Sequence, residues 1–166
     1  MSVWMALAGL AIGHVTASFV QTYFHRVLGH DAFGGWIHTL HVGEHHTIYS
    51  GERIETPRYS NDEKSLTLVY LLASLLMLPA FLVLPLPLAA GFASGLVLSY
   101  LAHIHLHAQY HLSDALFRNQ AWFRRLRDLH MVHHHHQNRN FAVIDLYWDK
   151  LMGTFAGTEA GDGADA

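Results

Sequence analysis

Two long stretches without charged residues alternate with polar, histidine-rich segments along the chain. Residues 2–24 contain no Lys, Arg, Asp or Glu, and as an α-helix they would extend about 34 Å, enough to cross a bilayer. A cleaved signal peptide would need a basic start and a shorter apolar core, whereas the first basic residue is Arg26. The pattern therefore predicts a membrane-spanning helix at 2–24.

The second uncharged stretch, residues 65–102, is too long for one crossing. As a single helix it would extend about 57 Å, roughly twice the thickness of the hydrocarbon core. Pro85 and Pro87 lie near its middle and remove two backbone donors, which interrupts a continuous helix. We therefore predict a hairpin with spans at about 65–83 and 88–106, and a shallow, partly re-entrant hairpin is the alternative.

The basic residues give an independent prediction of topology. All ten Lys and Arg residues lie in 25–64 or after residue 106, and the positive-inside rule places such segments in the cytoplasm. Three crossings with the N-terminus on the opposite side satisfy that rule. We expect an all-α integral membrane helical bundle with three to four membrane-embedded helices and a cytoplasmic histidine-rich cap, formed by 25–64 and 107–155. Residues 1–156 would form one domain, and 157–166 an acidic, disordered tail.

Histidine is the unusual component of this composition, with 16 residues in a chain of 166. Because there is no cysteine, a metal would be held by nitrogen and oxygen atoms alone. The net charge of −3 and the lack of a basic block give no reason to propose nucleic acid as a partner.

Ten of these histidines occur in four clusters with the spacing of metal ligands. One ion rarely takes more than four to six protein ligands, so ten convergent imidazoles predict two metals. The clusters are His-x4-His (His25, His30), His-x3-His-His (His41, His45, His46), His-x3-His (His107, His111) and His-x2-His-His (His130, His133, His134).

Helical geometry adds expectations about which rings meet. His130, His133 and His134 share one face of an α-helix and can converge on one point. His38, His41 and His45 also lie close to one stripe, with His46 displaced by one residue's rotation. The five-residue spacing of His25 and His30 corresponds to about 140° of rotation, so these rings share a face only where the helix ends or bulges. Gly29 offers that break.

Other polar residues are candidates for orienting the imidazoles rather than for binding metal. Glu44 is a candidate ligand or orienter, although an exposed charge is the favoured interpretation, and the isolated His14 is left out of the site. The remaining candidates are His38, His103, Tyr110, Asp128, Asn140, Asp145 and Asp149.

The order and spacing of the four clusters resemble the membrane-bound fatty acid hydroxylase and sterol desaturase superfamily of di-iron oxygenases. The resemblance covers residues 20–155 and includes Asn140-Phe141 and the segment from Trp148 to Thr154. The stretch HRVLGHDAFGGWIHTLHVGEHH is also similar to bacterial carotene hydroxylases. Two departures are Ala142, where the family usually has glycine, and the lack of a fused cytochrome domain.

The resemblance implies O2-dependent hydroxylation, or less often desaturation, of a lipid such as a fatty acyl chain, sterol or carotenoid. It implies two iron ions held by the ten histidines, with zinc possible after isolation, and no catalytic group beyond the metal ligands. Electrons would come from a ferredoxin or cytochrome with its reductase. Two alternatives remain. A zinc or copper transporter would need polar groups along a pathway through the membrane, whereas only His14 lies within a predicted span. A haem cytochrome would need fewer histidines than this chain has.

Overall fold

The computed structural model describes residues 2–60 and 78–158, and within these residues every regular element is a helix. An isolated β-bridge joins Thr56 to Leu112. The all-α prediction is therefore confirmed for the described part of the chain. The elements are α1 (Ser2–Phe24), η1 (His25–His30), η2 (Ala32–Gly34), α2 (Trp36–His38), η3 (Thr39–His45), α3 (His46–Ile48), η4 (Gly51–Arg53), α5 (Leu78–Val83), α6 (Leu86–Tyr110), α7 (Ala121–His135) and α8 (Tyr147–Met152).

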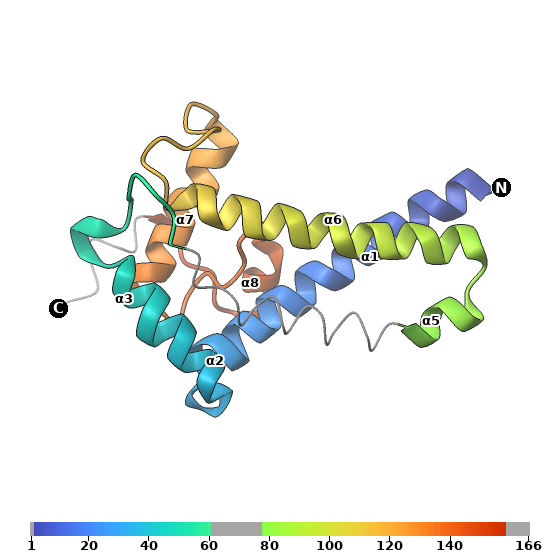
Figure 1. The fold of residues 1–166 in the computed structure, drawn as a ribbon, viewed down its shortest axis with the longest axis horizontal. Helices are drawn as coiled ribbons and strands as arrows, with labels where there is room; N and C mark the ends of the chain where they lie inside the picture. Colours follow the sequence, from blue (N-terminus) through green and yellow to red (C-terminus); the bar gives the residue numbers. More distant parts are fainter. Residues whose placement is uncertain (1, 61–77, 159–166) are drawn as a thin grey trace.

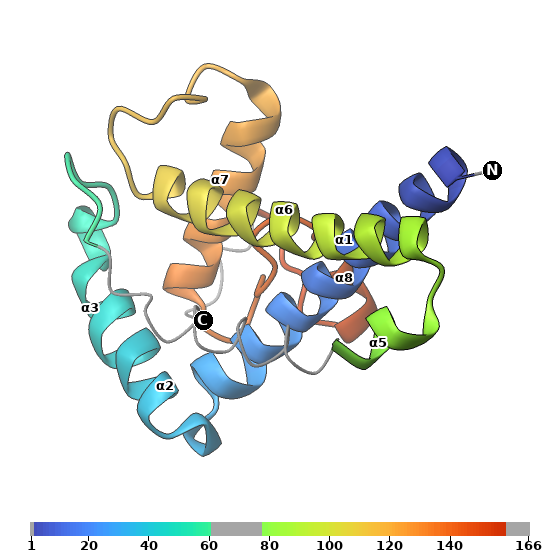
Figure 2. The ribbon, with the colours of Figure 1, turned by 45° about the vertical axis from the view of Figure 1, so that its right-hand side comes forward.

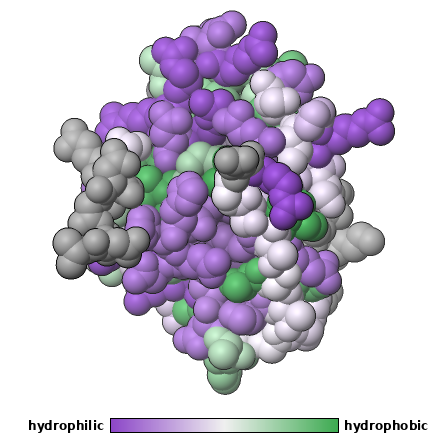
Figure 3. Space-filling view, turned by 90° about the vertical axis from the view of Figure 1, so that its left-hand side faces the viewer, coloured by the Kyte–Doolittle hydropathy of each residue, from purple (hydrophilic) through white to green (hydrophobic). Residues whose placement is uncertain are grey.

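Two helices form an elongated shaft (Figure 1). Most of the shorter elements gather at one end of it, whereas α5 lies near the other end. The helical segment Ser2–His30 and helix α6 are the two described helices long and apolar enough to cross a membrane. Side chains on their outer faces, among them Trp4 and Val97, are exposed. The face of the molecule at the end where most of the shorter elements lie is mostly hydrophilic (Figure 3). This division is what a membrane-embedded shaft with a water-facing head requires.

The shaft is held together by backbone contact between α1 and α6 at glycines. A Cβ atom on Gly13 would lie 2.2 Å from the carbonyl oxygen of Phe92, and one on Gly95 would lie 2.2 Å from that of Leu10. Gly9 and Gly91 are equally constrained. Each helix thus carries a small-x3-small pair, which allows close approach of helices in a membrane where dispersion rather than water drives association.

The two shaft helices are parallel. Gly91 contacts Ala6, and Gly95 contacts Leu10, so residue numbers rise together along the crossing. Both helices consequently deliver their C-terminal ends, with His25 and His107, to the same end of the molecule, as Figures 1 and 2 show. This parallel packing places residues 82 positions apart in the sequence within one site.

The proline-rich turn agrees with the predicted hairpin, with one shift of boundary. Helix α5 ends at Val83, and α6 begins at Leu86 with Pro85 as its N-cap. Pro87 lies in the first turn of α6, where a backbone N–H would have no acceptor within the helix, so its missing N–H costs no hydrogen bond. The helix can therefore start at Leu86, two residues before the expected position. The part of the expected second span at 65–77 lies outside the described residues, as does most of the tail. The total of three to four membrane-embedded helices stays a prediction.

Helix α7 is fixed beside the end of α6 by a small apolar core (Figure 2). Tyr110, Ala115, Phe123 and Val143 are buried together there. The Tyr110 hydroxyl donates to the carbonyl oxygen of Val143 at 2.9 Å, so the tyrosine ties the loop after α7 to α6. This packing sets the position of the histidines on α7.

We expect a side chain at the glycine crossing to destabilise the protein, because it meets backbone rather than a movable side chain. Gly95→Leu should lower the free energy of unfolding by about 1–3 kcal/mol and the Tm in detergent by roughly 2–10 °C. Ala90→Leu adds similar bulk on the same helix at an exposed position and is the matched control. Equal Tm values for the two variants would contradict the crossing.

Candidate metal centre

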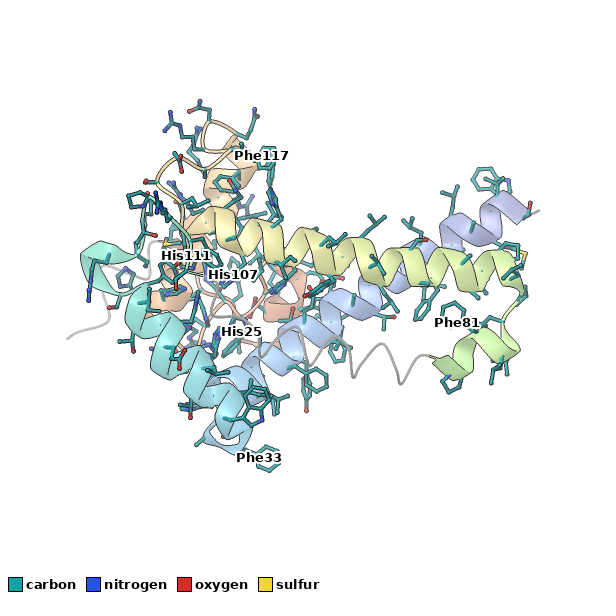
Figure 4. All side chains as sticks on the ribbon, viewed as in Figure 1. His25, Phe33, Phe81, His107, His111 and Phe117 are labelled. Carbon is teal, nitrogen blue, oxygen red and sulfur yellow. The ribbon has the colours of Figure 1, made fainter. Side chains whose placement is uncertain are left out.

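The ten histidines expected as ligands lie in two compact groups at the inner end of the shaft. Within each group the candidate ligand nitrogens are all within 4.8 Å of one another. Figure 4 shows His25, His107 and His111 pointing into the space between the ends of α1 and α6. Group A comprises His25, His30, His41, His46 and His133, and group B comprises His45, His107, His111, His130 and His134.

Group B uses ordinary α-helical spacing. His107 and His111 project from the last turn of α6, and His130 and His134 from α7, each pair four residues apart. Residues at i and i+4 lie on the same face of an α-helix, so each helix presents two rings to one point. The fifth member, His45, comes from the end of η3.

Group A uses π-helical spacing. The pair His25 and His30 and the pair His41 and His46 are each five residues apart. The first pair bounds the π-helix η1, and in the second His46 directly follows the π-helix η3, with its backbone N–H donating to the carbonyl of His41. A π-helix closes its hydrogen bonds between i and i+5, so residues five apart come onto one face. Gly29 does not end the helix. Its lack of a side chain makes room instead, since a Cβ atom there would lie 3.2 Å from both His25 and His41 ring carbons.

Two of the expected convergences are wrong. His133 belongs to group A while His130 and His134 belong to group B, and His41 and His45 are divided between the groups in the same way. Neighbouring positions on a helix differ by about 100°, so a helix that passes between two sites supplies both from adjacent faces. The groups are nevertheless in contact, because the rings of His46 and His134 stack with centroids 4.3 Å apart.

The spacing of the nitrogens fits ligands of a single ion in each group. In group A the Nε2 atoms of His25 and His41 are 2.7 Å apart, and those of His41 and His30 are 3.1 Å apart. In group B the Nε2 atoms of His111 and His130 are 3.1 Å apart. Two nitrogens that bind one metal at about 2.1 Å and at a right angle lie about 3 Å from each other.

Backbone carbonyls fix the tautomer and orientation of several rings. The Nδ1 atom of His25 donates to Phe141 at 2.6 Å, and that of His133 donates to Arg139 at 2.7 Å. In group B, Nδ1 of His111 donates to Ile54 and Nδ1 of His134 donates to Tyr49, both at 2.9 Å. Because a carbonyl oxygen only accepts, Nδ1 carries the proton and Nε2 is the atom with the lone pair that a metal ion would bind.

Asp149 and Asn140 support the rings through the backbone rather than by touching them. The buried Asp149 carboxylate accepts from the N–H groups of Phe141 and Ala142, each at 2.8 Å, and from the Thr154 hydroxyl at 2.7 Å. It therefore holds the peptide whose carbonyl orients His25. Asn140 donates to the carbonyl oxygens of Leu129 and Ala156 and accepts from the N–H of Ala156, which fastens the same loop to α7.

The other candidate orienters take different positions. His103 is buried on α6 with its ring centroid 6.1 Å from that of His107. His38 is partly exposed, and Glu44 and Asp128 are exposed, outside both groups. Asp145 contacts His14 on α1, at 3.2 Å between Nε2 and Oδ2.

The sequence did not identify Tyr49 and Tyr59, which cover group B. Tyr49 is fully buried, and its ring stacks on His111 with centroids 4.1 Å apart. The Tyr59 hydroxyl lies 3.5 Å from Nδ1 of His107. Both tyrosines lie in or next to irregular chain, where no periodicity relates them to a histidine. Only their nearness to the second cluster could have drawn attention to them.

Burial keeps the imidazoles neutral. It lowers the pKa of His46 to about 3, with neighbouring imidazoles adding to the effect. Burial first, and then the nearby rings, lower the pKa values of His41, His45, His130, His133 and His134 well below 6.5. A neutral imidazole is the form that binds a metal ion.

The residues fit a metal ion in each group. His133 is fully buried, and its Nε2 atom has no hydrogen-bond partner among the described residues. An unpaired buried nitrogen is costly, and a cation bound to its lone pair removes that cost. Ten nitrogen donors without a thiolate suit a first-row transition metal such as iron or zinc.

Comparison with known proteins places the chain in a family. The family model described as fatty acid hydroxylase matches residues 10–154, so the chain belongs to the fatty acid hydroxylase family, as the spacing of its histidine clusters predicts. Family membership assigns it to the oxidoreductases that act on lipids, and with its two long apolar helices to a membrane. The comparisons with curated proteins and with solved structures gave no match.

The metal-free protein should lose stability in acid. The unfolded chain takes up protons on histidine near pH 6.5, whereas the buried imidazoles resist protonation, so the free energy of unfolding is retained above pH 6.5 and falls below it. Each ring that stays neutral contributes up to about 1.4 kcal/mol per pH unit. Thermal unfolding between pH 8 and 5 measures this. A His135→Ala control, at an exposed position, should give the same profile, and a Tm independent of pH would contradict the burial.

Asp149→Asn should weaken metal binding selectively in group A. The amide places an N–H group against a backbone N–H, which disturbs the carbonyl that orients His25, and loss of such support typically costs 10–100-fold in metal affinity. Calorimetric titration with Zn²⁺ should show one weakened and one retained site. Asp128→Asn, at an exposed carboxylate, is the control. Equal weakening of both sites would contradict a local role for Asp149.

Proposed function

We propose that this protein is a membrane-bound di-iron oxygenase that uses O2 to hydroxylate a C–H bond of a lipid. The observation that carries the proposal is the pair of five-histidine groups in contact at the inner end of the apolar shaft. Membership of the fatty acid hydroxylase family supports the reaction class. Desaturation of the same substrate is the neighbouring reaction, because it begins with the same C–H bond.

The chain's own residues hold the metals and position the substrate. Groups A and B each offer more nitrogen donors than a structural zinc site needs, and neutral imidazoles leave the charge of the ions in place. Bound iron would supply activation of O2 and oxidation of the C–H bond. The protein contributes orientation, through the carbonyls behind the rings, and exclusion of water by the buried Tyr49 that covers group B.

The substrate would reach the metals from the lipid. Helices α1 and α6 carry exposed apolar side chains along their length, and His25 directly follows α1 while His107 lies in the last turn of α6. A fatty acyl chain, sterol or carotenoid lying along this surface would extend toward the histidine groups without entering water. Fixing one carbon near the metals is the main contribution that a protein makes to such a reaction.

The proposal includes a partner and an orientation. Hydroxylation with O2 consumes two electrons, so a ferredoxin or cytochrome with its reductase would supply them. The histidine groups would face the cytoplasm, with the N-terminus on the other side. The distribution of Lys and Arg and the hydrophilic face in Figure 3 support this orientation.

The decisive test compares two neighbouring histidines of α7. His133→Ala removes a buried member of group A, whereas His135→Ala removes an exposed ring outside both groups. We expect two metals per chain and lipid oxidation in the wild type and in His135→Ala, but at least a hundredfold loss of turnover in His133→Ala.

Metal analysis and mass spectrometry of lipids from expressing cells provide the measurements. A mass increase of one oxygen atom indicates hydroxylation, and a loss of two hydrogens indicates desaturation. Full activity in His133→Ala would refute the proposal. Metal flux into proteoliposomes without lipid oxidation would favour the transporter instead.

A further inference from the structure

A polar cluster joins α1 to α8 away from the histidine groups. Nε2 of His14 lies 3.2 Å from Oδ2 of Asp145. The Ser18 hydroxyl donates to the same carboxylate oxygen, and Nε1 of Trp148 donates to the Ser18 oxygen at 3.1 Å. Figures 1 and 2 both show α8 beside the middle of α1. No partner of His14 can be recognised from sequence alone, because Asp145 is 131 positions away.

The position of this cluster is unusual for a purely structural link. His14 lies within the apolar segment long enough to cross a membrane, where ionisable residues are costly and usually mark functional sites. The side chains of His14 and Asp145 are 40% and 18% exposed, so the pair is open to the surroundings. Trp148 already secures α8 to α1 through Ser18 and through an edge-to-face contact with Phe19.

One carboxylate oxygen of the cluster is available to a ligand. Both protein contacts fall on Oδ2 of Asp145, and Oδ1 has no hydrogen-bond partner among the described residues. A carboxylate oxygen only accepts, so the group that it can bind is a donor. In an apolar surrounding this points to the O–H of an otherwise apolar molecule.

A group of aromatic rings on α1 and α8 adjoins this polar cluster, to which Trp148 belongs. Phe19 stacks with Tyr23 at 5.8 Å between centroids and meets Trp148 at 4.9 Å, and Trp148 meets Tyr147 at 4.6 Å. Phe19, Tyr23 and Tyr147 are each about two-fifths exposed. An apolar, aromatic surface with a few fixed polar groups is the usual composition of a small-molecule site.

We propose that this surface binds the hydroxyl end of a lipid, with the O–H donating to Asp145 and the aromatic rings contacting the chain. The assignment rests on the proposed function, in that the bound lipid is the substrate. His14 is eleven residues before His25 on the same helical segment, which places the hydroxyl about 16 Å from the metal centre. The substrate class is therefore a long-chain lipid that carries a hydroxyl group about that distance from the carbon to be oxidised.

The test uses fluorescence of Trp148 and two brominated probes that differ by one hydroxyl. In a variant with Trp4, Trp36 and Trp122 replaced by Phe, quenching by dibrominated stearyl alcohol is compared with quenching by the dibrominated alkane of equal chain length. We expect half-maximal quenching at about tenfold lower concentration of the alcohol, the effect of one hydrogen bond to a charged group.

Asp145→Asn, in the same background, should reduce that preference to twofold or less, and Val15→Leu, at an exposed neighbour of His14, should keep it. Metal content and Tm, measured on each variant, should stay unchanged in both. Equal quenching by the two probes in the parent, or an undiminished preference in Asp145→Asn, would overturn the site. If Asp145→Asn loses structure, the parent's preference for the alcohol over the alkane still decides.

The assay needs neither O2 nor reductant, so it separates the two proposals. Preference for the alcohol in a protein that oxidises no lipid would refute the proposed function and leave the binding site. Lipid oxidation by a protein that binds both probes equally would refute the site and leave the function.

Discussion

The structure depends on backbone carbonyl groups that orient four of the buried imidazoles. Four rings donate Nδ1–H to backbone carbonyls, at Tyr49, Ile54, Arg139 and Phe141. Such a carbonyl adds no negative charge, so the positive charge of a bound ion is left in place. The carboxylate of Asp149 acts one step further out, on the N–H groups of Phe141 and Ala142. The irregular loops are therefore as much a part of the site as the helices.

The candidate ligands could be recognised from the sequence, but their division into two groups could not. Spacings of three to five residues identify rings that one helix can present together, and the ten histidines of the four predicted clusters are the ten that lie in groups A and B. Spacing alone does not select them, because His38, His103, His135 and His136 have a neighbouring histidine at the same spacings and lie outside both groups. Whether His133 joins His134 or faces away from it depends on where α7 lies relative to the two groups, which is a tertiary property. The carbonyl acceptors and Tyr49 leave no pattern at all, because main-chain atoms are the same at every residue.

In the fold, too, the features that depend on neighbouring residues could be predicted from the sequence, and the contacts between distant residues could not. Uncharged length predicted α1 and α6, and the prolines predicted the turn at Pro85, because both depend on local chemistry. The contact of Gly13 with Phe92 joins segments far apart in the chain. A glycine pair in an apolar helix does not indicate which other helix packs against it. The same holds for His14 and Asp145, each of which looks unremarkable until the fold brings them together.

The glycine crossing has a mechanical consequence for the metal centre. Beyond the crossing, α1 and α6 separate toward the histidine groups (Figures 1 and 2). A change in the crossing angle would therefore move the histidine-bearing ends of both helices. The distance from Gly13 to His25 along the helix is about 18 Å. A tilt of about 3° at the crossing would therefore move the His25 ring by about 1 Å. The separation of groups A and B therefore depends partly on this crossing, which lies within the two helices long and apolar enough to cross a membrane, where lipid thickness and lateral pressure would act on them.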